Sequence, residues 1–219
     1  MGQTKNIIAE IGKTDSDQSV IIDFEKTPHL MLNGASGCGK SQCLFRIIEE
    51  LSSHYSPAEV RFLLVDFKKI DFSHFREKPH LFAPIVTEEG AAEYALECIL
   101  QLVEKRIEGS MPMDAHLFVV VDELCDLVWS YYGKRSIERI KELLEKGASA
   151  NIHLILSMQV IDKMVPHKAF PARLIGRVIE RRDCKCALDK NDPLTLQCGE
   201  MILVTANEKT RFHIAMVKD

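Results

Sequence analysis

The sequence predicts an α/β domain with a mainly parallel central sheet flanked by helices. In three segments an apolar, strand-like run is followed by loop residues and then by a stretch with helical spacing. A glycine-rich loop follows the first run, and a pair of acidic residues follows the third. Unbroken apolar strands that alternate with helices are typical of a parallel sheet covered on both faces. The two loops place polar chemistry at the carboxyl ends of strands, where ligands bind in such sheets.

The first two units supply two strands and two helices. A strand is expected at 29–33, followed by a helix over 42–54. Four apolar residues of this helix recur at helical spacing: Leu44, Ile47, Ile48 and Leu51. The second unit has an expected strand at 60–66 and, after a long loop, a helical pattern over 88–107.

The third unit completes the expected parallel series. Its strand is expected at 117–122, its helical region reaches residue 148, and a fourth strand follows at 152–158. The last part of the chain differs, because short strand-like runs alternate there with turns. We expect short antiparallel strands in this part, with a hairpin loop at 207–210; the strands are expected at 173–179, 201–206 and 211–217.

Composition is that of one ordinary globular domain, residues 1–219. Hydrophobic residues make up 46% and charged residues 27%. No apolar run approaches the ~20 residues of a membrane helix, and the N-terminus lacks the apolar core of a signal peptide. A cytoplasmic location is therefore expected. The formal net charge of −4 argues against a broad basic surface for nucleic acid. The cysteines number seven and suggest no disulfide framework, and Cys184 and Cys186 are interpreted as free thiols.

A phosphate-binding loop is predicted at 34–41, where the sequence GASGCGKS matches the Walker A pattern. Glycines let the backbone N–H groups turn toward phosphate oxygens, and the following helix adds its positive end. Lys40 is expected to reach the β- and γ-phosphates of ATP, and Ser41 to ligate Mg²⁺. Cys38 is expected to be oxidation-sensitive, because a helix N-terminus lowers the pKa of a thiol. The predicted nucleotide-binding residues are Gly34, Ala35, Ser36, Gly37, Cys38, Gly39, Lys40, Ser41 and Gln42.

The run LFVVVDE delivers two carboxylates at the end of a buried strand, as a Walker B segment does. Asp122 is expected to hold Mg²⁺, and Glu123 to orient and deprotonate the attacking water as the catalytic base. Gln159 follows the next strand. It is either a catalytic sensor of the γ-phosphate or an ordinary amide at a strand end.

These motifs, taken together and in order, resemble the motor domain of the FtsK/SpoIIIE family of double-stranded DNA translocases. This family lies in the HerA–FtsK branch of RecA-like ATPases. The resemblance extends over most of the chain, from PHLMLNG before the phosphate loop to GEMIL near the end. Three differences occur. Val160 and Ile161 stand where the family usually has arginine and proline, the segment from there to Pro171 is several residues shorter than usual, and Lys185 stands where arginine is common. The matching residues between the two ends include Asp66, Lys68, Pro79, His80, Asp122, Glu123, Gln159, Arg173, Asp183, Leu188 and Asp189.

The resemblance implies a RecA-like P-loop NTPase that binds ATP and Mg²⁺ and moves double-stranded DNA through a ring, of six subunits by resemblance. A neighbouring subunit would then supply an arginine to the active site, and Arg106 and Arg173 are the candidates. Lys163 and Lys168 lie in the segment expected to line the channel. Contact with a membrane is expected only through other parts of a longer protein.

Two other functions remain open on the sequence alone. Type VII secretion motors contain related domains, and VDFK at 65–68 resembles theirs, so the substrate would then be a protein. The chain could also be a nucleotide-binding assembly module with little turnover, although the intact Lys40, Ser41, Asp122 and Glu123 argue against this. Chromosome segregation and mobile-element or conjugative transfer are not distinguished by the sequence.

Overall fold

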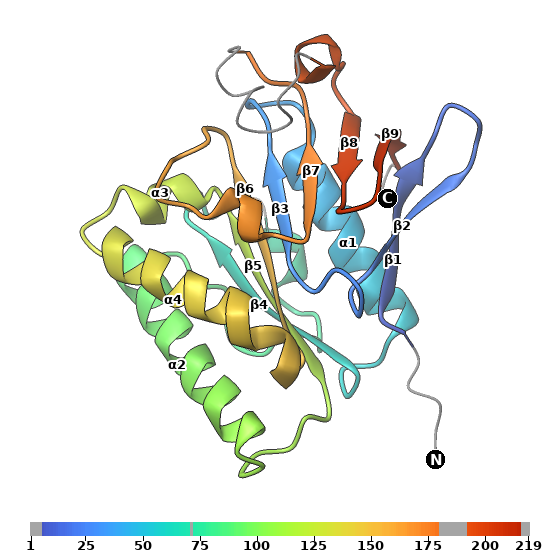
Figure 1. The fold of residues 1–219 in the computed structure, drawn as a ribbon. Helices are drawn as coiled ribbons and strands as arrows, with labels where there is room; N and C mark the ends of the chain where they lie inside the picture. The colour runs from blue at the N-terminus through green and yellow to red at the C-terminus, as the bar shows by residue number, and fades with distance from the viewer. Residues whose placement is uncertain (1–5, 71, 180–191, 216–219) are drawn as a thin grey trace.

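The computed structural model describes residues 6–70, 72–179 and 192–215. They form one sheet of nine strands, with the strand order β2-β1-β9-β8-β7-β3-β6-β5-β4 (Figure 1). The strands are β1 (Ile8–Lys13), β2 (Ser19–Asp23), β3 (Leu30–Asn33), β4 (Val60–Asp66), β5 (His116–Asp122), β6 (Ile152–Met158), β7 (Ala172–Ile175), β8 (Glu200–Val204) and β9 (Lys209–Ile214).

The five strands β7-β3-β6-β5-β4 are parallel to one another. Their register brings the polar strand ends together, because Asn33 pairs with Met158, and Asp66 pairs with Asp122. The loops that follow these strands therefore meet at one edge of the sheet, the edge where ligands bind in α/β folds. The predicted parallel centre of the sheet is confirmed.

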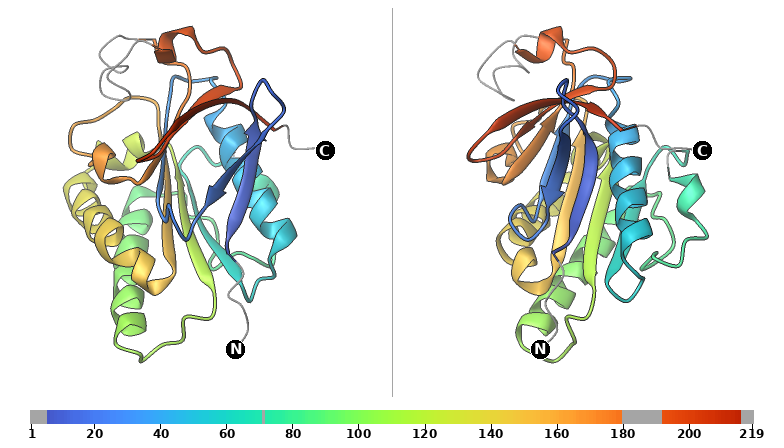
Figure 2. Two further views of the ribbon diagram at one scale, coloured as in Figure 1. Left: turned by 45° about the vertical axis from the view of Figure 1, so that its right-hand side comes forward. Right: turned by 90° about the vertical axis from the view of Figure 1, so that its right-hand side faces the viewer.

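Helices cover both faces of this centre (Figure 2). One face carries α1 (Lys40–His54), and the other carries α2 (Glu89–Ile107), α3 (Leu124–Val128) and α4 (Gly133–Lys146). Within the described residues, four 3₁₀ helices lie in the connections: Ser73–Phe75, Gly147–Ala150, His167–Ala169 and Asp192–Thr195. None of the helices in the described part of the chain is long and apolar enough to cross a membrane.

Alternation along β5 divides the apolar core in two. Phe118 and Val120 pack with α1 in one buried cluster, and Val119 and Val121 pack with α2, α3 and α4 in the other. Successive strand residues point to opposite faces, so an unbroken apolar strand serves both clusters. The predicted helix face over Leu44–Leu51 is buried in the first cluster, as its spacing indicated.

Three features differ from the sequence prediction. The antiparallel hairpin β1–β2 was missed, and it joins the sheet through β9. The strand predicted at 173–179 is only Ala172–Ile175, and it pairs in parallel with β3. The loop of the C-terminal hairpin is 205–208, two residues earlier than the predicted 207–210. The Thr205 N–H donates to the Glu208 carbonyl (3.0 Å), and β9 begins at Lys209.

The helical region after β5 is two helices, because the chain turns at 129–132. Ser130 makes this turn: its hydroxyl donates to the Leu127 carbonyl (2.8 Å) and accepts from the Tyr132 N–H (3.1 Å). Local side-chain bonds of this kind compete with the helical ladder. The second helix can then pack against α2, with Arg139 paired to Glu93 (2.7 Å) and Glu97 (2.8 Å).

Candidate nucleotide-binding and active site

The loop between β3 and α1 is shaped by its glycines. Gly37 and Gly39 have φ of 72° and 109°, a region that L-residues with a side chain rarely adopt. At Gly34 a Cβ atom would lie 2.6 Å from the Cys38 Sγ, so the loop closes too tightly there for any side chain. The sequence folds this way because only glycine fits the backbone that a phosphate-binding turn requires.

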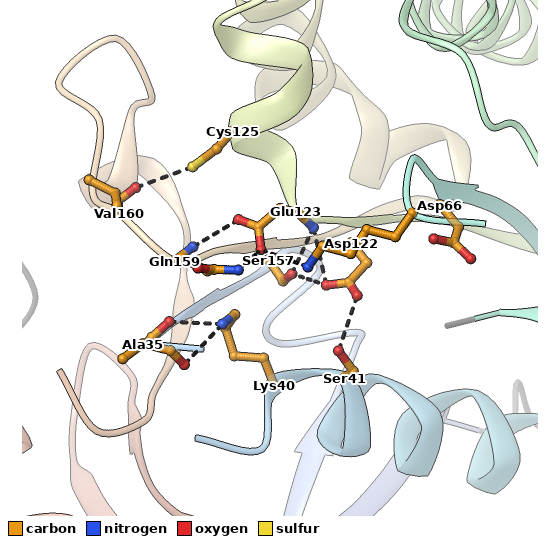
Figure 3. A network of polar contacts seen from close by, with 12 residues as sticks. Ala35, Lys40, Ser41, Asp66, Asp122, Glu123, Cys125, Ser157, Gln159 and Val160 are labelled. Carbon is orange, nitrogen blue, oxygen red and sulfur yellow. Dashed lines mark hydrogen bonds and ion pairs between the residues drawn. The ribbon is translucent and has the colours of Figure 1, made fainter. Parts of the chain in front are cut away.

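Lys40 is buried, with 6% of its surface exposed, and points back into this loop. Its ammonium group donates to the carbonyl oxygens of Gly34 (2.8 Å) and Ala35 (3.2 Å), as Figure 3 shows. A buried ammonium needs such partners, because burial of an unpaired charge is costly. The contacts fix the amine inside the loop, where it faces the space that phosphate oxygens would take.

Ser41, Asp122 and Ser157 form a chain of hydroxyl and carboxylate groups behind the loop (Figure 3). The Ser41 hydroxyl donates to Asp122 Oδ2 at 3.1 Å. Asp122 Oδ1 accepts from the Ser157 hydroxyl and from the Glu123 N–H, the latter at 3.1 Å. Ser157 was missed by the sequence prediction. Its one signal is that it is a polar residue inside the apolar strand β6, beside the strand that ends in Asp122.

Glu123 occupies a strained backbone position at the start of α3, with φ 57° and ψ 60°. The residue is 6% exposed, and Gln159 binds both carboxylate oxygens: the backbone N–H donates to Oε1 (3.2 Å) and the side-chain amide donates to Oε2 (2.5 Å). Lys68 approaches the same Oε2 at 3.4 Å. Strained residues of this kind cluster at active sites, and this one lines the same cavity as the phosphate loop.

One cavity of about 220 Å³ is lined by Lys40, Ser41, Asp122, Glu123 and Gln159, among other residues. Two of its residues were not predicted as site residues: Lys68, from the loop after β4, and Cys198, from the turn before β8. The Cys198 thiol donates to the Gly37 carbonyl (3.0 Å), and the Gly199 N–H donates to the Cys38 carbonyl (3.1 Å). The cavity is lined by Ser36, Gly37, Gly39, Lys40, Ser41, Gln42, Lys68, Asp122, Glu123, Gln159 and Cys198.

Three predicted loop residues lie behind the cavity and do not line it. Gly34, Ala35 and Cys38 are buried at the base of the loop. Cys38 is fully buried, and burial raises the pKa of its thiol more than the nearby Lys40 lowers it. The prediction that Cys38 is an oxidation-sensitive thiol with a lowered pKa is therefore wrong. Desolvation outweighs the helix terminus here.

The groups that line the cavity fit a nucleoside triphosphate with Mg²⁺. The glycine backbone leaves space that a Cβ atom would fill, and the fixed amine of Lys40 supplies positive charge. The hydroxyl of Ser41 and the carboxylate of Asp122 are oxygen donors, the type that Mg²⁺ prefers, and lie within 3.1 Å of each other.

The other predicted residues lie outside this cavity. The Arg106 guanidinium is 9% exposed and donates to the Ala150 carbonyl (2.8 Å) of its own chain. Arg173 is half-buried on β7, and Lys163 and Lys168 are exposed in the segment that precedes it. Six residues that the sequence analysis singled out lie outside the described part of the chain: Asp183, Cys184, Lys185, Cys186, Leu188 and Asp189.

Comparison with solved structures identifies the fold. The cytoplasmic domain of the type VII secretion ATPase EccC from Thermomonospora curvata superposes with a TM-score of 0.83 at 23% identity, covering 99% of this chain and 29% of that chain. The pCW3 conjugation coupling protein TcpA, solved with ATPγS, also gives 0.83, at 21% identity, covering 99% of this chain and 68% of that one. The chain therefore has the RecA-like P-loop ATPase fold.

Comparison with curated proteins identifies relatives by sequence. DNA translocase FtsK of Leptospira interrogans serogroup Icterohaemorrhagiae serovar copenhageni (strain Fiocruz L1-130) is 32% identical over 215 residues, which cover 85% of this chain and 22% of the relative. DNA translocase SpoIIIE of Bacillus subtilis (strain 168) is 29% identical over 248 residues, covering 97% and 31%. The chain thus spans less than a third of the length of these relatives. The model of the FtsK/SpoIIIE family matches residues 3–115, just over half of the 219 residues. With this match added to the motifs and the fold, the chain belongs to the FtsK/SpoIIIE family.

Proposed function

We propose that this domain is an ATP-hydrolysing motor that moves double-stranded DNA, in chromosome segregation or in mobile-element or conjugative transfer. The observation that carries the proposal is that Lys40, Ser41, Asp122 and Glu123 line one cavity, with the Ser41 hydroxyl 3.1 Å from Asp122 Oδ2. Phosphate-binding groups and a directed carboxylate are the parts that hydrolysis of a nucleoside triphosphate needs. The family membership, together with relatives named DNA translocases, supports duplex DNA as the substrate that is moved.

In this mechanism the residues have separate tasks. Backbone N–H groups of the loop and the Lys40 amine bind the phosphates, and Ser41 and Asp122 would hold Mg²⁺. Bound there, Mg²⁺ would supply positive charge that offsets the negative charge of the transferred phosphoryl group. Glu123 orients the water and accepts its proton at a carboxylate oxygen. Gln159, which binds that carboxylate through two N–H groups, keeps it directed toward the cavity.

The coupling to DNA is proposed to run through the segment after Gln159. The Cys125 thiol of α3 contacts the Val160 carbonyl (3.6 Å), so this segment is fastened beside Glu123. Farther along, Lys168 and Arg173 line one surface cavity of about 420 Å³, and Lys163 is exposed nearby in sequence. Such cations bind the phosphate backbone without reading its sequence, and their contribution falls as salt is added.

A ring is proposed because no arginine among the described residues lines the nucleotide cavity. A neighbouring subunit would supply one, and a ring of six is what the family resemblance implies. Arg106 and Arg173 are the two candidates for this arginine, and Arg106 donates to the Ala150 carbonyl of its own chain (2.8 Å). Where such an arginine is established, its effect is worth ~10³–10⁵ in rate.

The test measures ATP hydrolysis with and without long linear duplex DNA, at several salt and protein concentrations. Lys40→Ala serves as the blank, and Glu123→Gln should bind ATP but hydrolyse it slowly. We expect DNA to stimulate turnover, the stimulation to fade with salt, and specific activity to rise with protein concentration as rings form. Near-normal turnover by Glu123→Gln would remove Glu123 as the base, and turnover in assembled rings that ignores DNA would contradict the DNA substrate.

The second candidate function is a protein-secretion motor. The likeness to the EccC domain shows the fold alone. The segment VDFK at 65–68 resembles type VII secretion motors, so the experiment also tests a protein substrate. Assembled protein whose turnover ignores DNA and responds to a peptide would favour it. A binding module without turnover is disfavoured, because the four residues that hydrolysis needs all line the cavity: Lys40, Ser41, Asp122 and Glu123.

A further inference from the structure

Lys68 reaches the active site from the loop after β4, a strand that holds none of the predicted catalytic or metal-binding residues. It lies two residues after the end of β4, and β4 runs beside β5 with Asp66 opposite Asp122. The loop after β4 therefore lies next to Glu123, the residue after β5. The Lys68 amine is 3.4 Å from Glu123 Oε2, and its side chain, which is 46% exposed, also lines the nucleotide cavity.

The loop that carries Lys68 is built from a buried carboxylate. Asp66 is 2% exposed, and its two oxygens accept the N–H groups of Lys69 (3.0 Å) and Phe72 (3.0 Å). The loop also requires φ of 64° at Lys69. Phe72 is fully buried, so the far end of the turn is anchored in the core. Lys68 is thereby presented from a fixed turn.

The surroundings of Lys68 are acidic. Glu123 lies at 3.4 Å, and Asp126 lies one turn farther along α3. Burial and the charge of Glu123 raise the pKa of the Asp126 carboxyl, and the Lys68 charge opposes this. A cation at this place offsets negative charge on Glu123, which follows β5, and on Asp126 within α3. It also bears on the one oxygen of Glu123 that the Gln159 side chain binds.

We propose that Lys68 is a positioning residue for ATP hydrolysis, which holds the Glu123 carboxylate against Gln159 in the direction of the attacking water. The inference rests on the proposed ATPase function and goes beyond it by giving the β4 loop a share in catalysis. Two groups, Gln159 from the β6 side and Lys68 from the β4 side, then fix the base between them. A carboxylate fixed on both sides loses little freedom when it takes the proton, and misplacement by about 1 Å can cost ~10²-fold in rate.

The chain offers a matched control in the next residue. Lys69 pairs with Glu88 at 2.6 Å, its side chain is 56% exposed, and it does not line the cavity. Substitution to methionine keeps the aliphatic stem of either lysine and removes the charge. Lys68→Met should lower kcat about 10- to 100-fold while KM for ATP changes by less than about twofold. Lys69→Met should leave both constants unchanged.

Two further variants separate positioning from a general structural role. Lys68→Arg restores the cation and should recover most of kcat. In a Glu123→Gln background, Lys68→Met should cause no further loss beyond about twofold, because residues that act through one group are not additive. Thermal unfolding of each variant checks that the fold is retained.

The outcomes are distinct. A wild-type protein that binds ATP and hydrolyses none in the assembled state would defeat the proposed function itself. If the wild type turns over and Lys68→Met has a normal kcat, or raises only KM, the positioning role of Lys68 is overturned and the ATPase assignment stands. Equal losses for Lys68→Met with and without Glu123 would also overturn it.

Discussion

At the scale of single residues, Lys40 shows how the site is held ready. Its ammonium group is bound by two carbonyl oxygens of the loop that it serves. The ammonium group is thus fixed at a place where only 6% of the residue is exposed. Phosphate oxygens that carry negative charge are stronger acceptors than peptide carbonyls, so the amine gains by exchanging one partner for the other.

Removal of this amine gives the first prediction. Lys40→Ala should lose the thermal stabilisation that Mg²⁺–ATP gives to the wild type. A ligand at 100 times its Kd stabilises a protein by about 2.7 kcal/mol, and that gain disappears with the affinity. The melting temperature with and without nucleotide measures it. A normal shift in Lys40→Ala would refute the assignment of the phosphate loop.

Cys198 gives a second prediction, because an exposed thiol borders the cavity 3.0 Å from the Gly37 carbonyl. A maleimide should label it, and Mg²⁺–ATP should slow that labelling by covering the loop. Cys98 on α2, which is partly exposed and does not line the cavity, should label at a rate that nucleotide does not change. Peptide mass spectrometry assigns the label. Equal rates at Cys198 with and without nucleotide would place the nucleotide elsewhere.

The sequence predicted those site residues that belong to local motifs. Lys40 and Ser41 lie in one unbroken pattern, and Asp122 and Glu123 end one strand. Lys68, Ser157 and Cys198 were not assigned to the site, because each reaches it through the register of neighbouring strands or through a turn from the far end of the chain. Long-range pairing of this kind leaves little local signal in a single sequence; for Ser157 the signal is one polar residue within an apolar strand.

At the scale of elements, the same distinction holds for the fold. Strands β4 and β6 were predicted at their observed bounds, since an apolar strand buried on both faces is continuous in sequence. The β1–β2 hairpin was missed because only alternate residues of β2 are buried, and its core contacts come from distant elements. The parallel partner of β7 was not predictable locally for the same reason.

The start of α4 carries the third prediction. A Cβ atom at Gly133 would lie 1.9 Å from the Val128 carbonyl oxygen, which belongs to the preceding helix. Gly133→Ala should therefore destabilise the protein by about 1–3 kcal/mol through overpacking. Helix propensity alone predicts the opposite sign, a gain of about 1 kcal/mol. Denaturant unfolding distinguishes the two signs, with the exposed neighbour Lys134→Ala as the control. A stabilised Gly133→Ala would contradict the predicted overpacking between α3 and α4.

At the scale of the whole molecule, buried histidines link stability to pH. Burial lowers the pKa of His29 to about 4 and that of His153 to about 3. His29 accepts the Leu154 N–H (3.0 Å). His153 stacks on Phe118 with ring centroids 4.6 Å apart, and its Nε2 lies 2.8 Å from His116 Nδ1. Both rings are almost fully buried, so a positive charge on either one would lie away from water.

The fourth prediction follows from the sign of these shifts. Both histidines take up protons more readily in the unfolded chain, where their pKa is about 6.5. The two histidines should therefore add no pH dependence to the free energy of unfolding above about pH 7, and should lower it as pH drops below 6.5, by up to about 1.4 kcal/mol per pH unit for each group. Urea unfolding between pH 7.5 and 4.5 measures the slope. His153→Gln should flatten it, and substitution of the exposed His74 should not; equal slopes would contradict the assignment.

The two borders of the sheet are finished differently. Along β4, residues 80–86 run parallel to the strand and take up its outer hydrogen bonds, from the Phe62 N–H to the His80 carbonyl (2.9 Å) and from the Val86 N–H to the Leu64 carbonyl (2.9 Å). The other border is β2, whose Ile21 is 47% exposed and whose partner strand has an irregular register near Gly12. An uncovered strand is where a foreign chain adds, and a bulge that twists it away lowers that risk. Self-templated aggregation, if it occurs in this domain, would begin at β2 and not at β4.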